Sequence, residues 1–274
     1  MARQIHCGFD FDMYFNLSLL QMNIMVSSSR GGGLAGRFDK TLKEHKVMCN
    51  VVSGGRIEKL TEKALTLIPP THRYKEKTHI YIMAGLPDIT VKTHKGHGHY
   101  TECIYMEDTR HTINRVTKII REGAEAITKA GAMPIFCTIN SCDIEKYNKH
   151  LLTSHETSYL KHQDKYKEMQ ERLEIAIIEI NAYIVKLNSS ISMSTPYCHA
   201  QIHKRRGGSK KGYYKWLYDR LWDGVHGTDK TKDGWAHIIG NAIKANRIHY
   251  DTDTDTCNSP KRSWKSEKRQ KISI

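Results

Sequence analysis

The sequence lacks a long hydrophobic run, and no basic stretch leads into an apolar segment with a small-residue cleavage site. A bilayer-spanning helix needs roughly 18–20 apolar residues, and a secretory signal has the second pattern. The seven cysteines also lack the short paired spacings that are typical of secreted disulfide scaffolds. We therefore expect an intracellular protein, cytoplasmic or nuclear, without a membrane span and with reduced thiols.

Acidic residues are in deficit. The 29 Asp and Glu residues stand against 43 Lys and Arg residues, which gives a formal net charge of +14. An excess of this size favours polyanions such as nucleic acid or anionic lipid headgroups, although it says nothing about the fold.

Metal-binding motifs are also missing, since the sequence contains neither a Cys-x-x-Cys pair nor a His-Glu-x-x-His motif. A stretch that contains His94, His97 and His99 could supply ligands, with Cys137 and Cys142 as further candidates. Histidines interspersed with glycines are more often a solvated loop, so we predict no metal and no cofactor.

Short apolar segments alternate with helical patterns along most of the chain. The segments 21–28, 46–52, 78–86 and 133–139 are typical of buried strands, and the segments 57–65, 112–130, 165–187 and 235–246 have helical spacing. Such alternation predicts an α/β fold with three layers, α/β/α, around a central and mostly parallel sheet. We expect one domain over residues 21–247, an N-terminal extension over 1–20, and a disordered polar and basic tail over 248–274.

Residues with catalytic potential follow the predicted strands. Ser27, Ser28 and Ser29 precede three glycines and a helix, where backbone N–H groups and the helix dipole favour developing negative charge. Gly54 follows the second strand, and its N–H could approach a substrate because no Cβ stands in the way. Near the last helix, Asp223 stands three residues before His226, so a carboxylate could orient an imidazole from the same loop.

These motifs, S-S-S-R-G-G-G-L, V-S-G-G, A-G-L-P-D and D-G-V-H, resemble in order and spacing those of the SGNH or GDSL-type serine hydrolases over residues 21–246. The resemblance implies a flavodoxin-like sheet of about five strands and an esterase that forms an acyl-enzyme from a small acyl or acetyl ester. It further implies that Ser29 is the nucleophile, His226 the general base and Asp223 its orienting acid. The N–H groups of Ser29 and Gly54 would form the oxyanion hole.

One departure from the family pattern bears on activity. The third family motif reads Gly-x-Asn-Asp, whereas this chain has Gly85, Leu86, Pro87 and Asp88. Proline has no amide to offer an oxyanion, and losing one such donor costs serine hydrolases on the order of 10²–10³ in rate. The resemblance therefore leaves a weakened enzyme open.

A basic segment before the Asp-x-x-His loop supports an alternative function. A catalytically impaired protein of this fold could bind RNA or DNA through a mobile basic loop and the tail. The candidate nucleic-acid-binding residues are Lys204, Arg205, Arg206, Lys210, Lys211, Tyr213 and Lys215. This loop, the Ser-Arg-Gly turn and Thr195-Pro196 are also similar to SGNH-type domains of mobile genetic elements. A solvated positive surface is an equally simple interpretation.

Overall fold

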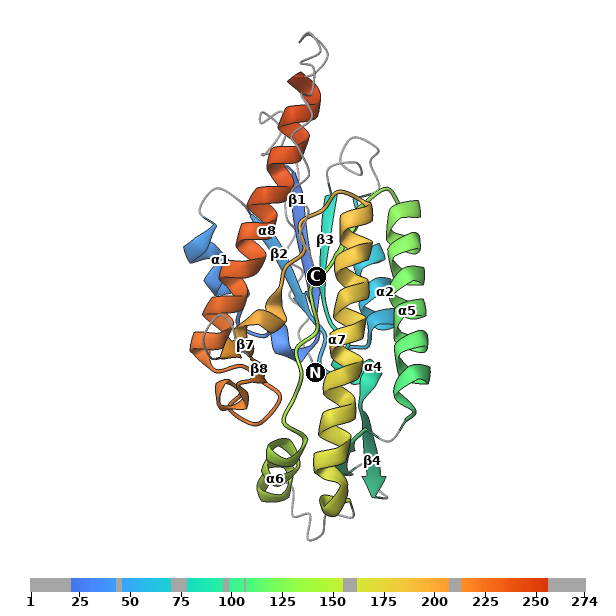
Figure 1. Cartoon of the computed structure of the whole chain (residues 1–274). Coiled ribbons are helices and arrows are strands. Elements are labelled where there is room, and N and C mark those ends of the chain that lie inside the picture. Colours follow the sequence, from blue (N-terminus) through green and yellow to red (C-terminus); the bar gives the residue numbers. More distant parts are fainter. Residues whose placement is uncertain are drawn as a thin grey trace, which may run out of the picture.

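The computed structural model describes residues 21–42, 46–69, 78–95, 99–105, 107–154, 162–206 and 213–255. The predicted extension 1–20 and residues 256–274 of the predicted tail lie outside these ranges. The described part is an α/β/α sandwich, as predicted (Figure 1). None of its helices is both long enough and apolar enough to cross a membrane.

The central sheet is parallel throughout. Its order is β2-β1-β3-β6, formed by β1 (Met22–Ser27), β2 (Val47–Val51), β3 (Thr78–Met83) and β6 (Met133–Phe136). We expected about five strands, and the described residues form four in this sheet. Residues 193–197 run beyond β6, where the Thr138 N–H donates to the Pro196 carbonyl over 3.0 Å. Pro196 has no N–H with which to continue a ladder, so no fifth strand forms there.

Each face of the sheet is apolar because successive side chains of a buried strand point to opposite sides. One face presents Ile24 and Val26 of β1 with Ile80 and Ile82 of β3. The other face presents Met25, Tyr81, Met83, Ile135 and Cys137. Both sets are nearly inaccessible to solvent.

Helices cover both faces. The first face is covered by α2 (Ile57–Leu67), α5 (Thr109–Lys129) and α7 (Tyr166–Ser190), and the second by α1 (Ala35–Thr41) and α8 (Asp229–Asp255) (Figure 1). The predicted apolar stripe of α5 is buried as expected. Its first turn is fixed by the Asp108 carboxylate, which accepts the His111 N–H over 2.8 Å.

Two segments that we predicted to be loops contain hairpins. The histidine-rich stretch forms β4 (Val91–Lys95) and β5 (His99–Ile104), and the basic segment forms β7 (His203–Arg206) and β8 (Tyr213–Trp216). Directly opposed rings stabilise the second hairpin, since His203 stacks on Trp216 with centroids 4.2 Å apart. The prediction from charge missed this pairing.

Short helices surround the sheet edge. Two of them, α4 (Leu86–Ile89) and α6 (Ile144–Ser154), were not predicted from the sequence. Four single turns complete the order: η2 (Ser29–Gly31), η3 (Gln163–Lys165), η4 (Cys198–Gln201) and η5 (Tyr218–Arg220).

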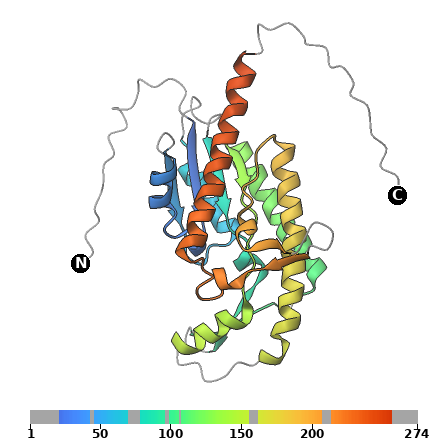
Figure 2. The same cartoon turned by 60° about the vertical axis from the view of Figure 1, so that its left-hand side comes forward.

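The last helix is longer than predicted at both ends. It begins at Asp229, where the Thr228 hydroxyl accepts the Thr231 N–H, and it continues to Asp255, so the predicted domain boundary at 247 falls inside it. Its final turns project past the sheet (Figure 2). Each residue added to an existing helix gains a backbone hydrogen bond, which lets a helix anchored by Trp235 and Ile239 extend into polar sequence.

Candidate active site

The candidate site lies where the strands of the parallel sheet end. The Ser28 N–H donates to the Met83 carbonyl at 3.1 Å, and the Val52 N–H donates to the Ser27 carbonyl at 2.8 Å, so three strand ends are tied side by side. In open parallel sheets this edge is where ligands bind. α4, α6 and both hairpins lie at this end of the molecule, the lower end in Figure 1.

Ser29, His226 and Asp223 meet at this edge. Ser29 begins the turn η2 directly after β1, and its Oγ is 3.1 Å from Nε2 of His226, 197 positions away in the sequence. The other ring nitrogen, Nδ1, is 2.6 Å from Oδ2 of Asp223. The three predicted side chains are thus connected by hydrogen-bond contacts, from the hydroxyl to the imidazole and from the imidazole to the carboxylate.

Backbone N–H groups of the loop 223–226 fix the Asp223 carboxylate. Oδ1 of Asp223 accepts the N–H of Val225 at 2.8 Å and the N–H of His226 at 2.6 Å. Gly224 has φ +90°, and a Cβ there would lie 2.7 Å from the Asp143 carbonyl oxygen and from the Tyr147 nitrogen. The loop therefore requires glycine both for its backbone conformation and for its contact with α6.

The Asp223 carboxylate is charged at neutral pH. Burial alone would raise its pKa, but the hydrogen bonds from the ring and N–H of His226 and from Val225 outweigh burial and lower the pKa from 3.8 to about 2. An ionised carboxylate only accepts hydrogen bonds, so Nδ1 carries the proton that faces it. Nε2 is then the nitrogen available to accept from the Ser29 hydroxyl.

Two backbone N–H groups at the site are unused. Within the described ranges, neither Ser29 nor Gly54 donates its N–H to a protein acceptor. Gly54 has φ +62°, and an added Cβ would meet nothing within 4 Å, so the backbone conformation rather than crowding requires glycine there. In the part of the chain that the structure describes, the two predicted oxyanion donors therefore have no protein acceptor.

The Gly85–Asp88 motif occupies α4 beside the edge. Pro87 is half-buried in the first turn of this short helix. Asp88 is buried, and its carboxylate accepts the Ile57 N–H at the start of α2. Burial raises the pKa of Asp88 to about 6, against the lowering effect of that hydrogen bond and of Arg56 and Arg115.

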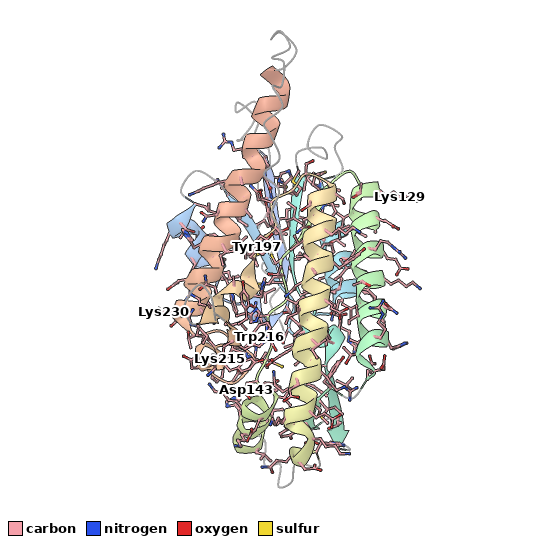
Figure 3. The ribbon with its side chains drawn as sticks, viewed as in Figure 1. Lys129, Asp143, Tyr197, Lys215, Trp216 and Lys230 are labelled. Atoms are coloured by element: carbon pink, nitrogen blue, oxygen red, sulfur yellow. The ribbon has the colours of Figure 1, made fainter. Side chains whose placement is uncertain are left out.

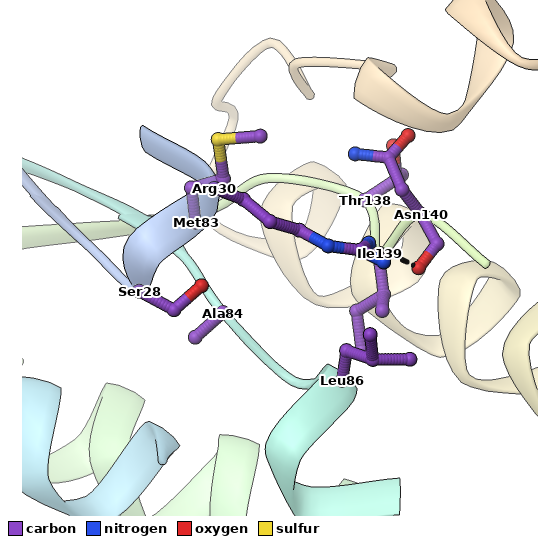
Figure 4. A pocket seen from close by; sticks show the side chains of 8 residues that line it. All are labelled: Ser28, Arg30, Met83, Ala84, Leu86, Thr138, Ile139 and Asn140. Carbon is purple, nitrogen blue, oxygen red and sulfur yellow. Dashed lines mark hydrogen bonds between the residues drawn. The ribbon is translucent and has the colours of Figure 1, made fainter. Parts of the chain in front are cut away.

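Arg30 is a structural component of the site that the sequence analysis overlooked. Its buried guanidinium crosses to the loop after β6, where Nη1 donates to the Asn140 carbonyl at 2.6 Å and Nη2 to the Ser141 carbonyl at 3.1 Å (Figure 4). These bonds fix the turn that carries Ser29. An arginine inside a serine- and glycine-rich turn was the available signal.

A small cavity lies beside the Arg30 side chain. Its volume is about 10 Å³, and its walls are Ser28, Arg30, Met83, Ala84, Leu86, Thr138, Ile139 and Asn140 (Figure 4). Nε of Arg30 and Oδ1 of Asn140 are buried without a hydrogen-bond partner in the described part of the chain. A volume of this size is at the lower limit for one water molecule.

Trp222 is a second residue that sequence reasoning missed. It is 54% exposed, and its ring lies nearly parallel to that of His226 with centroids 6.1 Å apart. The backbone N–H of Trp222 donates to the His226 carbonyl at 2.9 Å, which joins the two ends of the loop that carries Asp223. A tryptophan directly before Asp223 was the signal in the sequence for an aromatic ring beside the imidazole.

The predicted basic site is described in part. Lys204 and Lys215 occupy opposed positions on β7 and β8. Arg205, Arg206 and Tyr213 are described as backbone only, and Lys210 and Lys211 lie outside the described ranges.

The histidine-rich segment is described less completely. His97 and the side chains of His94 and His99 lie outside the description. Among the residues that are described, no group of three or more His, Cys, Asp or Glu is placed to hold a metal ion.

Comparisons with known proteins identify the fold. No protein-family model matches the chain, and no curated protein sequence matches it. Among solved structures, a Bacteroides fragilis protein provisionally assigned as an acylhydrolase is 13% identical, with a TM-score of 0.51 over 84% of this chain and 88% of that one. A GDSL-like lipase from Bacteroides thetaiotaomicron is 14% identical, with a TM-score of 0.49 over 84% and 89%. An acetyl xylan esterase is 14% identical, with a TM-score of 0.46 over 81% and 100%.

These comparisons do not address the resemblance to mobile-element domains, which stays a prediction. At such low identity a structural match reports on architecture alone. The chain has the fold that its four motifs predicted, that of the SGNH or GDSL-type hydrolases.

Proposed function

We propose that this protein is a serine hydrolase that cleaves a small acyl or acetyl ester through an acyl-enzyme on Ser29. The observation that carries the proposal is the unbroken path from Ser29 Oγ through the His226 ring to the Asp223 carboxylate, with contacts of 3.1 and 2.6 Å. Nucleophile, base and orienting acid in hydrogen-bond contact define this chemistry irrespective of fold.

In the acylation half, Nε2 of His226 takes the proton from Ser29 Oγ while the oxygen attacks the ester carbonyl. The imidazolium that forms lies against the ionised Asp223, which stabilises its charge. The N–H groups of Ser29 and Gly54 donate to the tetrahedral oxyanion. When the carbonyl re-forms, the ester C–O bond breaks and His226 returns the proton to the departing alcohol.

Deacylation repeats these steps with water. His226 removes a proton from water, the hydroxide attacks the acyl carbonyl, and the proton then passes to Ser29 Oγ as the carboxylic acid leaves. The exposed ring of Trp222 beside His226 offers an apolar wall to one side of the ester.

The proposed substrate has a small acyl group. The cavity behind the Ser29 turn measures about 10 Å³, which leaves no room for a long chain there. A hollow of about 380 Å³ adjoins Gly54, within the range of small-molecule sites, and is lined by Arg56, Glu58, Lys59 and Glu62. A polar hollow of this kind suits a polar alcohol portion better than a fatty one.

Turnover of p-nitrophenyl acetate tests the proposal, with Ser29→Ala as the main variant and Ser28→Ala as the matched control. Ser28 is the adjacent, buried serine, and its hydroxyl is not the one in contact with His226. We expect Ser29→Ala to abolish turnover above the uncatalysed rate and Ser28→Ala to remain within a few-fold of the parent. Equal turnover by the parent and Ser29→Ala contradicts the assignment.

A further inference from the structure

A row of four aromatic rings crosses the surface at the β7–β8 hairpin. Consecutive centroids are 6.2 Å apart for Tyr197 and His199, 6.0 Å for His199 and His203, and 5.1 Å for His203 and Tyr214. Tyr214 is 67% exposed and Tyr197 is 46% exposed. We call these four residues the aromatic strip. A single exposed ring is ordinary, whereas a contiguous exposed apolar patch often marks a binding site.

The aromatic strip is held rigidly from beneath. His203 stacks on Trp216 at 4.2 Å, and Trp216 lies nearly parallel to Tyr218, whose hydroxyl is 2.9 Å from Ser141 Oγ. On the other side, Nδ1 of His199 is 2.9 Å from the Thr138 hydroxyl. A preformed set of rings loses little entropy when a ligand stacks on it.

Positive charge lies on the other face of the hairpin from the rings, because Lys204 and Lys215 alternate with His203, Tyr214 and Trp216 along the two strands. Lys204 and Lys215 are directly opposed in the hairpin register, an arrangement in which like charges destabilise a strand pair. Neither lysine forms an ion pair within the described ranges. Lys215 and Trp216 lie on the same side of the molecule as Tyr197, away from Lys129 on α5 (Figure 3). A bound anion would relieve the repulsion between the two lysines.

We propose that the aromatic strip binds single-stranded nucleic acid, with bases stacked on the exposed tyrosines, and that Lys204 and Lys215, on the opposite face of the same hairpin, add electrostatic attraction for its phosphates. Every base offers a π face, and base stacking on aromatic side chains together with backbone neutralisation is how proteins bind single strands without sequence preference. The adjacent rings are tilted by 32° to 56° rather than closed face to face, which leaves ring faces available at the surface.

An acidic peptide would complement the positive charge but would offer no base to stack on the exposed rings. The formal net charge of +14 on the whole chain adds long-range attraction for a polyanion. The strip is built from residues other than Ser29, Asp223 and His226, so binding and ester turnover are separable.

Fluorescence anisotropy distinguishes base stacking from phosphate attraction when two labelled 12-mers are compared, one of thymidine and one of abasic residues. We expect Tyr214→Ala to weaken binding of the thymidine strand by about 5- to 150-fold, the range for removing one ring on which a base stacks, and to leave the abasic strand unaffected. Tyr214→Phe keeps the ring and should keep the affinity. Ester turnover by Tyr214→Ala should equal that of the parent.

The double variant Lys204→Gln, Lys215→Gln should weaken both strands and reduce the slope of log affinity against log salt by about 0.7 for each phosphate that is no longer neutralised. Lys129→Gln is the matched control and should leave the slope unchanged. Equal affinity for both strands, an unaffected Tyr214→Ala, tighter binding of polyglutamate, or no binding at 50 mM salt would each overturn the proposal.

Discussion

Replacing Gly224 with alanine should damage both stability and catalysis, because this glycine sets the loop that carries Asp223 and His226. At φ +90° a side chain costs about 1–3 kcal/mol of backbone strain. The new Cβ would also lie 2.7 Å from the Asp143 oxygen and the Tyr147 nitrogen. Both are backbone atoms at the start of α6, so neither can swing aside, and overpacking of this kind typically costs about 1–3 kcal/mol.

The loop can relieve the clash only by moving away from α6, which breaks the 2.8 Å hydrogen bond from the Asp143 N–H to the Gly224 carbonyl. His226 moves with the loop, and a displacement of about 1 Å from Ser29 can cost about 100-fold in rate. We expect the free energy of unfolding to fall by about 2–6 kcal/mol in urea titrations and kcat to fall by about two orders of magnitude.

Gly36→Ala provides the matched control for this variant. Gly36 is exposed within α1, and a Cβ there meets nothing within 4 Å, so alanine should be neutral or stabilising by up to about 1 kcal/mol. If Gly224→Ala unfolds and turns over substrate like the parent, the geometric account of the loop is wrong.

Three further substitutions test separate parts of the site. Asp223→Asn should keep the fold but lower kcat by about 10⁴-fold, measured with p-nitrophenyl acetate, because an amide cannot stabilise the imidazolium of His226; a loss below tenfold would argue against the orienting role. Asp88 has a pKa near 6 when folded and 3.8 ordinarily, so the folded state holds its proton more tightly, and stability should fall by up to about 3 kcal/mol as the pH rises from 4 through 6. Asp88→Asn should flatten that slope in urea unfolding at pH 4.5 and 7.5, and an identical slope would contradict the assignment. Pro87→Asn restores an amide at the position where the family has asparagine and should raise kcat, by at most about 10²–10³-fold; an unchanged kcat would show that the missing donor is not what limits turnover.

The sheet and the positions of Ser29, Asp223 and His226 beside it could be predicted because they depend on short local sequence patterns. Short apolar runs separated by helical periodicity predict parallel strands, and parallel strands end at one edge. Ser29 follows the first run, whereas Asp223 and His226 precede the last helix. The resemblance of the four motifs to those of the SGNH or GDSL-type hydrolases then paired residues that are 197 positions apart.

The features of the fold and of the site that were not predicted depend on contacts between segments distant in the sequence. Arg30 is recognisable as a support only when the carbonyls of Asn140 and Ser141 are seen beside it. The hairpin at 203–216 was concealed by its charge, because its stability comes from cross-strand rings rather than from an apolar run. The described residues add no fifth strand beside β6, where Pro196 has no N–H to donate to a ladder.

Covalent labelling gives the most direct test of whether Ser29 is a nucleophile activated by His226. The protein is incubated with a fluorophosphonate probe, and the modified peptide is identified by mass spectrometry in the parent, in Ser29→Ala and in His226→Ala. The account predicts a single adduct on Ser29 that is absent from Ser29→Ala and strongly reduced in His226→Ala. An unlabelled parent, or labelling on another serine, would contradict it.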